Sequence, residues 1–416
     1  MDSALRELRF ALRDPVVVLT LIVGGLLSTF TIFSGLKEIS TERAQIERVK
    51  QMVDSDRAYT LEDQGDAGSA AYYAFHFTYD PPSALAFAAR GIRDDLPWKH
   101  RIRMLALEGQ IYETDAGNPE LSRVGKLDFA FITAFLLPLL LILLLHDLKA
   151  GEARNNRWTF LSATSGNGPR ILQGRALLRT VLLFVCVMTP FIIAAFMSAA
   201  SVTNVLIVLL AVAVNFAFWS WLSLFITARV EAGPTAAALL LGVWFALAVA
   251  LPVGGKLTVE NTVPVPKGGE LLLTQREAVN DAWDIPREAT MTPFYERHPE
   301  WADSEPFSEG FDWYWYYAFQ QVGDQTVETM SQELREGVAA RDSVMGLISF
   351  ISPPLLVDRA FASVARTDIP SFQAYDRCVR DFHGKLRKFY YEMLFGDTQY
   401  SAKVMEGLPK FAPCSS

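Results

Sequence analysis

Apolar residues are concentrated in five long runs whose one charged residue is Arg179, near the start of the third run. A transmembrane helix needs about 20 mostly apolar residues, with a range of roughly 17–25, and each run lies in or close to this range. One run is near the N-terminus and four form a block. The pattern predicts an all-α polytopic membrane protein with five transmembrane helices, at Pro15–Gly35, Phe129–Leu145, Ala176–Ser198, Val202–Ala228 and Thr235–Val253.

Two long polar segments, residues 36–128 and 254–416, flank the four-helix block at 129–253, and they are long enough to build a folded domain. An apolar stripe from Leu36 to Val53 predicts that the first helix continues outward. A stripe from Phe372 to Met393 predicts another helix with Ser371 as its N-cap. We therefore expect one mainly helical domain built from both segments. Further predictions are a helix at about 325–350 and a loop at 254–269.

A sixth apolar segment, Val344–Ala365, is interrupted by Pro353-Pro354 and followed by charge. Its unbroken part has the length of an interfacial or core segment rather than of a crossing. Residues 1–14 have apolar and charged positions on different faces. They predict an amphipathic N-terminal helix on the inner membrane surface, or else a simple extension of the first transmembrane helix.

Charge sets the expected orientation. The loop from Asp147 to Arg179 has six Lys and Arg residues against two acidic ones, whereas the chain as a whole has a net charge of −8. Because short basic loops remain in the cytoplasm, we expect the N-terminus and this loop to be cytoplasmic. Both polar segments then lie on the outer side of the membrane.

Candidate chemistry is sparse. The chain has no P-loop, nucleophile elbow or zinc-protease motif, so we expect no enzyme activity, no metal and no directly bound cofactor. Cys378 and Cys414 are able to pair in an oxidising space, but their spacing does not establish it. The aromatic run from Phe311 to Tyr317 suits a helix core and interface anchors, or alternatively a ligand or lipid surface.

Polar side chains are rare within the apolar runs, and the fourth run has the most notable ones. Asn215, Ser220 and Ser223 lie there, with Trp219 among them. Helix–helix hydrogen bonding is the usual role of such groups. The alternative is that Asn215, Trp219, Ser220 and Ser223 line a substrate path.

The loop after the second run carries the most specific pattern. Glu152, then Leu161-Ser162, Pro169 and Arg175, follow the second helix in order. In this order of features the chain resembles the ABC-2-type transporter permeases. The stretch from Asn118 to Leu139 and the Ser352-Pro353-Pro354 and Thr367-Asp368 motifs resemble a bacterial subgroup with large periplasmic inserts and a domain of unknown function.

The resemblance implies a permease subunit that couples ATP hydrolysis on a separate cytoplasmic ATPase subunit to export of an unknown, amphipathic substrate. ATP and Mg²⁺ would bind that partner. It also implies a second permease copy or paralogue and a sixth transmembrane helix, supplied after Ser416 or by a partner. A mechanotransmitting complex acting on a periplasmic partner, and a receptor or assembly factor without transport, are the alternatives. We expect no nucleic-acid partner.

A permease without an ATP site depends on an ATPase partner in the cytoplasm. The loop at 147–175 is the main cytoplasmic surface expected, so we expect the ATPase to act on the permease there. A short amphipathic helix there suits a groove on the ATPase. Glu152 and Arg175 are expected to form exposed ion pairs worth about 0–1 kcal/mol. The expected interface residues are Glu152, Arg154, Trp158, Phe160, Leu161, Ser162 and Arg175. The alternative is that this helix lies on the membrane surface.

Overall fold

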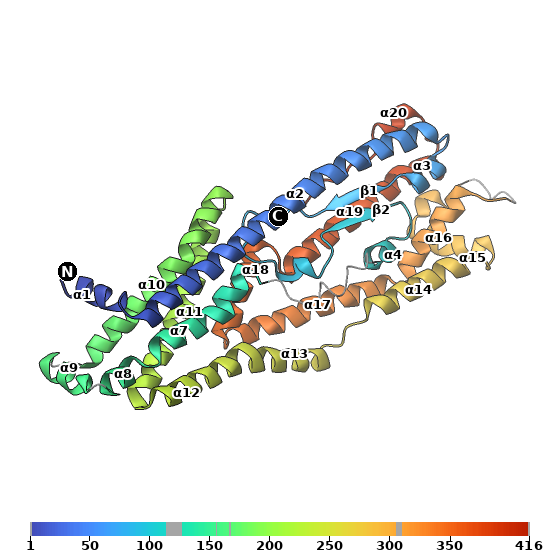
Figure 1. Cartoon of the computed structure of the whole chain (residues 1–416). Coiled ribbons are helices and arrows are strands. Elements are labelled where there is room, and N and C mark those ends of the chain that lie inside the picture. The colour runs from blue at the N-terminus through green and yellow to red at the C-terminus, as the bar shows by residue number, and fades with distance from the viewer. Residues whose placement is uncertain (1, 114–126, 155, 166–167, 305–309, 415–416) are drawn as a thin grey trace.

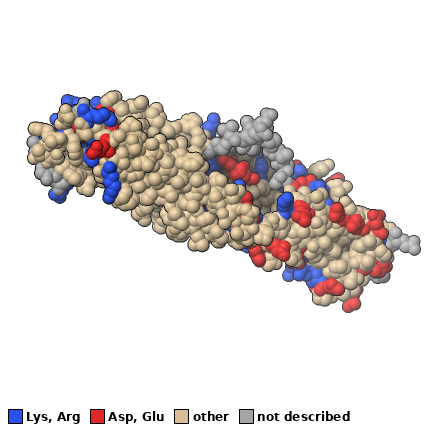
Figure 2. All heavy atoms as spheres, turned by 90° about the horizontal axis from the view of Figure 1, so that it is seen from below, with Lys and Arg blue, Asp and Glu red and all other residues tan. Residues whose placement is uncertain are grey.

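The computed structural model describes residues 2–113, 127–154, 156–165, 168–304 and 310–414. The molecule is elongated, with a bundle of apolar helices at one end and a polar domain at the other (Figure 1). In Figure 2, Lys and Arg gather at the end with α1, α8 and α9, both signs of charge cover the polar domain, and a band without charged side chains separates them.

The apolar bundle contains the predicted helices. Its elements are α1 (Asp2–Ala11), the first half of α2 (Pro15–Asp63), α6 (Phe129–Phe131), η2 (Ile132–Leu136), α7 (Leu137–Leu145), α10 (Gly168–Met197), α11 (Val202–Arg229), α12 (Gly233–Phe245), η3 (Ala246–Ala250) and α13 (Leu251–Thr262). Five helices in the described residues are long and apolar enough to cross a membrane, namely Pro15–Asp63, Phe129–Arg154, Gly168–Met197, Val202–Arg229 and Gly233–Thr262. They indicate a membrane-embedded chain and confirm the expected number.

Helix α2 is a single helix of 49 residues, so it is about 74 Å long at 1.5 Å per residue. Asp14 caps its N-terminus by accepting a hydrogen bond from the Val16 amide at 3.0 Å, and Pro15 suits the first position. Ile32, Ile39 and Ile46 recur every seven residues on its buried side. The predicted outward continuation of the first helix is confirmed, and α2 joins the bundle to the polar domain (Figure 1).

Two π-helical turns, η2 and η3, lie within the second and fifth apolar helices. Such turns carry an extra residue and leave carbonyl groups poorly bonded along the helix. Side chains on neighbouring helices donate to these carbonyls: Trp244 Nε1 to Phe135 O at 2.9 Å and Asn215 Nδ2 to Thr133 O at 3.3 Å. The bonds pin α11 and α12 to the second apolar helix without charge.

The polar domain is built from both polar segments, as expected. Its elements are the outer half of α2, α3 (Ala67–Tyr73), β1 (His76–Tyr79), η1 (Gly91–Asp94), β2 (Lys99–Ile102), α4 (Leu107–Tyr112), α14 (Gly268–Asp281), α15 (Arg287–Arg297), η4 (Pro299–Trp301), α16 (Trp313–Thr326), α17 (Glu328–Ser349), α19 (Ile369–Leu394) and α20 (Ala402–Met405). Trp315, Tyr317 and Phe319 of α16 are buried in its core with Tyr391 of α19. The aromatic run is thus mainly helix core.

Three sequence expectations need correction. The chain is not purely α-helical, because β1 and β2 form an antiparallel pair with His76 opposite Ile102. The loop expected at 254–269 is largely helical, since α13 extends the fifth apolar helix to Thr262. The N-cap of α19 is Asp368, which accepts from the Ser371 amide at 3.1 Å; Ser371 is three positions further on.

Helices α17 and α18 (Pro353–Ala365) form a hairpin that enters the apolar bundle. Val357, Phe361 and Ala365 of α18 are buried in the bundle core, and Phe361 packs edge-on against Phe129. The segment expected to be too short for a crossing therefore reaches into the bundle and returns. We call α17–α18 the re-entrant hairpin.

The C-terminal part of the chain is tied to α19. Cys378 and Cys414 form a disulfide with their Cα atoms 5.9 Å apart. The pairing that spacing alone left open is therefore present in the structure. It closes the chain end back onto the polar-domain core.

Candidate functional site

Six of the seven predicted interface residues lie on two short helices, α8 (Leu148–Arg154) and α9 (Arg157–Ser165), which we call the elbow; the seventh, Arg175, lies on α10. The elbow is at the end of the bundle opposite the polar domain (Figure 1). Asn156, which directly precedes α9, has a φ of 54°, in the left-handed region that Asn tolerates better than most residues.

Glu152 is the internal anchor of the elbow. It is 7% exposed and accepts from Arg175 Nη1 at 2.8 Å and Arg157 Nε at 2.9 Å. Arg175 also donates from Nε to Glu7 at 2.9 Å. The expectation that Glu152 and Arg175 form exposed pairs is wrong, because their side chains are only 9% and 12% exposed. Their ion pairs join α8 to α10 and α1.

Arg154 lies on the open side of the elbow. Its side chain is 60% exposed and makes a two-pronged ion pair with Asp147, with one N–O distance of 3.0 Å. On the other side of the elbow, Lys149 donates to the Ala228 carbonyl at the end of α11 at 2.9 Å. The elbow therefore touches the third and fourth apolar helices as well as α1.

The four predicted residues of α9 have different environments. Trp158 is half-buried and packs on Gly168, where an added Cβ would come within 3.0 Å of its ring. Ser162 donates its hydroxyl to the Trp158 carbonyl at 2.9 Å. Leu161 is half-buried. Phe160 is 69% exposed, so it is the apolar side chain of α9 most available to a partner.

The predicted substrate-path residues of α11 lie inside the bundle. Asn215, Trp219 and Ser223 have no exposed surface, and Trp219 Nε1 donates to Asn215 Oδ1 at 3.0 Å. Ser220 shares a 2.7 Å hydrogen bond with Thr180 of α10. These contacts fit helix–helix packing, and a substrate path along them stays a prediction.

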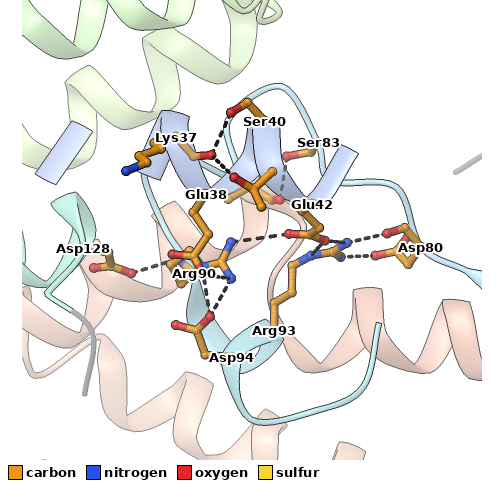
Figure 3. A network of polar contacts seen from close by, with 12 residues as sticks. Lys37, Glu38, Ser40, Glu42, Asp80, Ser83, Arg90, Arg93, Asp94 and Asp128 are labelled. Carbon is orange, nitrogen blue, oxygen red and sulfur yellow. Dashed lines mark hydrogen bonds and ion pairs between the residues drawn. The ribbon is translucent and has the colours of Figure 1, made fainter. Parts of the chain in front are cut away.

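A second ion-pair cluster, which the sequence did not indicate, lies where α2 leaves the bundle. We call Glu38, Glu42, Asp80, Arg90, Arg93 and Asp94 the junction. Figure 3 shows Arg90 between Glu38 and Asp94, and Arg93 between Glu42 and Asp80.

The junction is tightly bonded and buried. Arg93 Nε is 2.9 Å from Glu42 Oε1, and both side chains are 5% exposed. Arg93 Nη1 is 2.5 Å from Asp80 Oδ2. Arg90 Nη2 is 2.7 Å from Asp94 Oδ1 and 3.2 Å from Glu38 Oε1. Burial opposes the charge of Arg90, but the surrounding carboxylates outweigh it and raise its pKa above the usual value.

The polar domain has a cleft of about 790 Å³ between α4, α16 and α19. Ion pairs form part of its lining, with Arg387 Nη2 2.6 Å from Asp324 Oδ2 and Arg380 bonded to Glu108. Burial raises the pKa of Asp324 despite its arginine partner, and lowers that of His383. Because charges of both signs are paired across the cleft, it favours no one class of ligand.

The described residues contain no cluster of three or more His, Cys, Asp or Glu side chains able to hold a metal ion. A family model described as a domain of unknown function (DUF3526) matches residues 269–413, which is less than half of the chain. No curated protein and no solved structure matches. The matched stretch covers most of the second polar segment, including the re-entrant hairpin, and excludes the elbow.

Proposed function

We propose that this chain is the membrane subunit of an ABC transporter of the ABC-2 type, in a bacterial inner membrane. A separate ATPase subunit would bind the elbow from the cytoplasm, and the polar domain would be periplasmic. The observation that carries the proposal is the elbow itself: an exposed Phe160 and Arg154 on two short helices that Glu152 ties to α1 and α10. The basic charge of that end supports the orientation.

A load applied to the elbow would reach the bundle by two routes. One runs from Glu152 through Arg175 directly into α10. The other runs from Arg175 to Glu7 on α1, which precedes α2. Ion pairs at 2.8–2.9 Å are short and charge-assisted, so they resist displacement better than a loose surface contact.

The first test removes the exposed contact and leaves the internal anchors in place. Phe160→Asp should abolish co-purification with an ABC ATPase, identified by its P-loop sequence, and with it vanadate-sensitive ATP hydrolysis. Trp158 is a poorer target, because it packs on Gly168 within the elbow. Phe311, 52% exposed in the polar domain, provides the matched control as Phe311→Asp. An ATPase yield from Phe160→Asp equal to that from the control would refute docking through this residue.

Mechanotransmission is the second candidate, and the unbroken α2 favours it over export. A helix of about 74 Å that begins beside the elbow and is clamped by the junction would carry movement into the polar domain. No substrate channel through the membrane is needed for this task.

A break in α2 beyond the junction separates the two candidates. Met52 is 57% exposed, and Met52→Pro would interrupt the helix there at a cost of about 3 kcal/mol. Mechanotransmission predicts that ATP changes hydrogen exchange in the polar domain of the native complex but not of this variant, while hydrolysis continues. Met52→Ala is the control. An unchanged ATP-dependent exchange pattern in Met52→Pro would favour export instead.

A further inference from the structure

The re-entrant hairpin reaches the middle of the apolar bundle. At its tip, Ser352 Oγ donates to the Leu247 carbonyl at 2.8 Å. Leu247 lies near the centre of the fifth apolar helix, Gly233–Thr262. If that helix crosses a bilayer, the tip of the hairpin lies near mid-depth.

The tip exposes apolar side chains at this depth. Leu347, Phe350 and Ile351 are 69%, 76% and 65% exposed. A contiguous apolar surface of this kind is unfavourable in water and compatible with lipid tails. The other side of α17 is covered, because Ile348 and Met345 pack closely over Gly255 of α13.

A groove of about 750 Å³ runs between η1, α17 and α18, and its lining includes both apolar and charged side chains. Among the lining residues, Leu347, Phe350 and Leu356 are close to the tip along α17 and α18, and Asp342 and Arg359 are further from it along the two helices. Eight residues of helix separate Phe350 from Asp342, which is about 12 Å. That is close to the roughly 15 Å of one leaflet's hydrocarbon. The groove thus has the apolar-to-charged order of a single-chain amphiphile.

The charged end of the groove has more acid than base. Arg359 is neutralised by Asp342, with two N–O distances of 2.7 and 3.1 Å. Asp95 and Asp358 also line the groove. Within the described residues, no side-chain hydrogen bond or ion pair joins either carboxylate to a partner. The unbalanced charge therefore favours a positively charged head group.

We propose that this groove binds a single-chain amphiphile with an ammonium head group, placing the head at Asp358 and Asp95 and the tail along Leu347 and Phe350. The inference goes beyond the proposed function and stands without an ATPase partner. A free amine-bearing amphiphile is the occupant that the charge and length favour. A neutral or anionic lipid is an alternative that the experiment distinguishes.

The test uses the purified full chain in phosphatidylcholine nanodiscs without an ATPase. Radiolabelled dodecylamine is titrated against the chain by equilibrium dialysis, with empty nanodiscs as the baseline. Dodecanol and dodecanoate serve as matched neutral and anionic probes. We expect saturable binding of dodecylamine, and only baseline retention of the other two.

Two variants and their controls locate the site. Asp358→Asn should weaken dodecylamine binding about tenfold, since a contact to a charged group is lost. Ser343, exposed at the groove wall, allows Ser343→Trp to fill the groove without entering a core, and this variant should abolish saturable binding. Asp381→Asn and Gln332→Trp, at exposed positions outside the groove lining, should bind as the native chain does.

Three results would contradict the proposed site or its charge preference. Native affinity in both Asp358→Asn and Ser343→Trp would overturn the site. Equal binding of dodecanol would overturn the charge assignment, and tighter binding of dodecanoate would reverse it. If Asp358→Asn does not fold, as judged by its elution profile, Ser343→Trp still decides the question, because its added side chain replaces an exposed one.

Discussion

The elbow and the junction are both ion-pair clusters, and they lie at opposite ends of the apolar bundle. The junction is closed: Glu42 and Arg93 are each 5% exposed on their side chains. The elbow is half open, because Glu152 is buried while Arg154 and Phe160 face outward. Ion pairs thus hold buried segments together at the junction, whereas at the elbow they hold two short helices whose outer surface stays accessible.

The two clusters therefore differ in which residues stabilise the structure and which are available to a partner. A buried charge that loses its partner is costly, whereas an exposed pair contributes little. Stability should therefore depend most on the junction, less on the inner side of the elbow and least on its outer side. Three substitutions test this order.

The largest expected effect is at the junction. Arg93→Met leaves the carboxylates of Glu42 and Asp80 without their main partner and should reduce the free energy of unfolding by about 3–5 kcal/mol. Denaturant-induced unfolding of the detergent-purified chain measures it. Arg48→Met, at an exposed position of the same helix α2, is the control. A loss no larger than that of the control would show that the clamp is not stabilising.

An intermediate effect is expected on the inner side of the elbow. Glu152→Gln removes the carboxylate that Arg175 and Arg157 share, but Arg175 keeps Glu7. The loss should be about 1.5–3 kcal/mol, with faster proteolysis at the elbow as a local readout. Glu277→Gln, exposed on α14, controls for loss of charge. Proteolysis unchanged from the native rate would mean that Glu152 does not hold the elbow in place.

The smallest effect on stability is expected on the outer side. Arg154→Ala breaks an exposed pair with Asp147 and should cost about 0–1 kcal/mol. Arg297→Ala, which breaks the exposed pair with Glu328, is the matched control in the polar domain. The two variants should unfold alike, while Arg154→Ala alone weakens ATPase binding if the elbow docks as proposed. A loss of several kcal/mol for Arg154→Ala would place this residue among the anchors instead.

The sequence predicted features that depend on local periodicity. The long apolar runs predicted the five apolar helices, and the stripe from Leu36 to Val53 predicted the extension of α2. The junction escaped prediction, because Arg90 and Arg93 lie about 50 residues from Glu38 and Glu42, in a stretch with no helical or strand period. Such a pairing depends on how distant segments pack, which one sequence does not encode locally.

The break at Pro353-Pro354 is another feature that local sequence predicts. Helix α17 ends at Ser349, and the two prolines occupy the first turn of α18, so the segment is divided where the sequence predicts it. Ser352 accepts a hydrogen bond from the Leu355 amide as its N-cap. The N-cap and proline signal was present in the sequence. By contrast, the glycines after Pro252 predict a loop, yet Gly255 lies within α13 and gives α17 room to pack closely on it.

The π-helical turns η2 and η3 also bear on how the bundle changes shape. Each places one extra residue in an otherwise α-helical segment, and one residue corresponds to about 100° of helical rotation. If such a turn migrates along its helix, the residues it passes rotate by that angle while the helix stays continuous. The hydrogen bonds from Asn215 and Trp244 to η2, and from Ser352 to η3, would then stabilise one rotational position of each helix relative to the others.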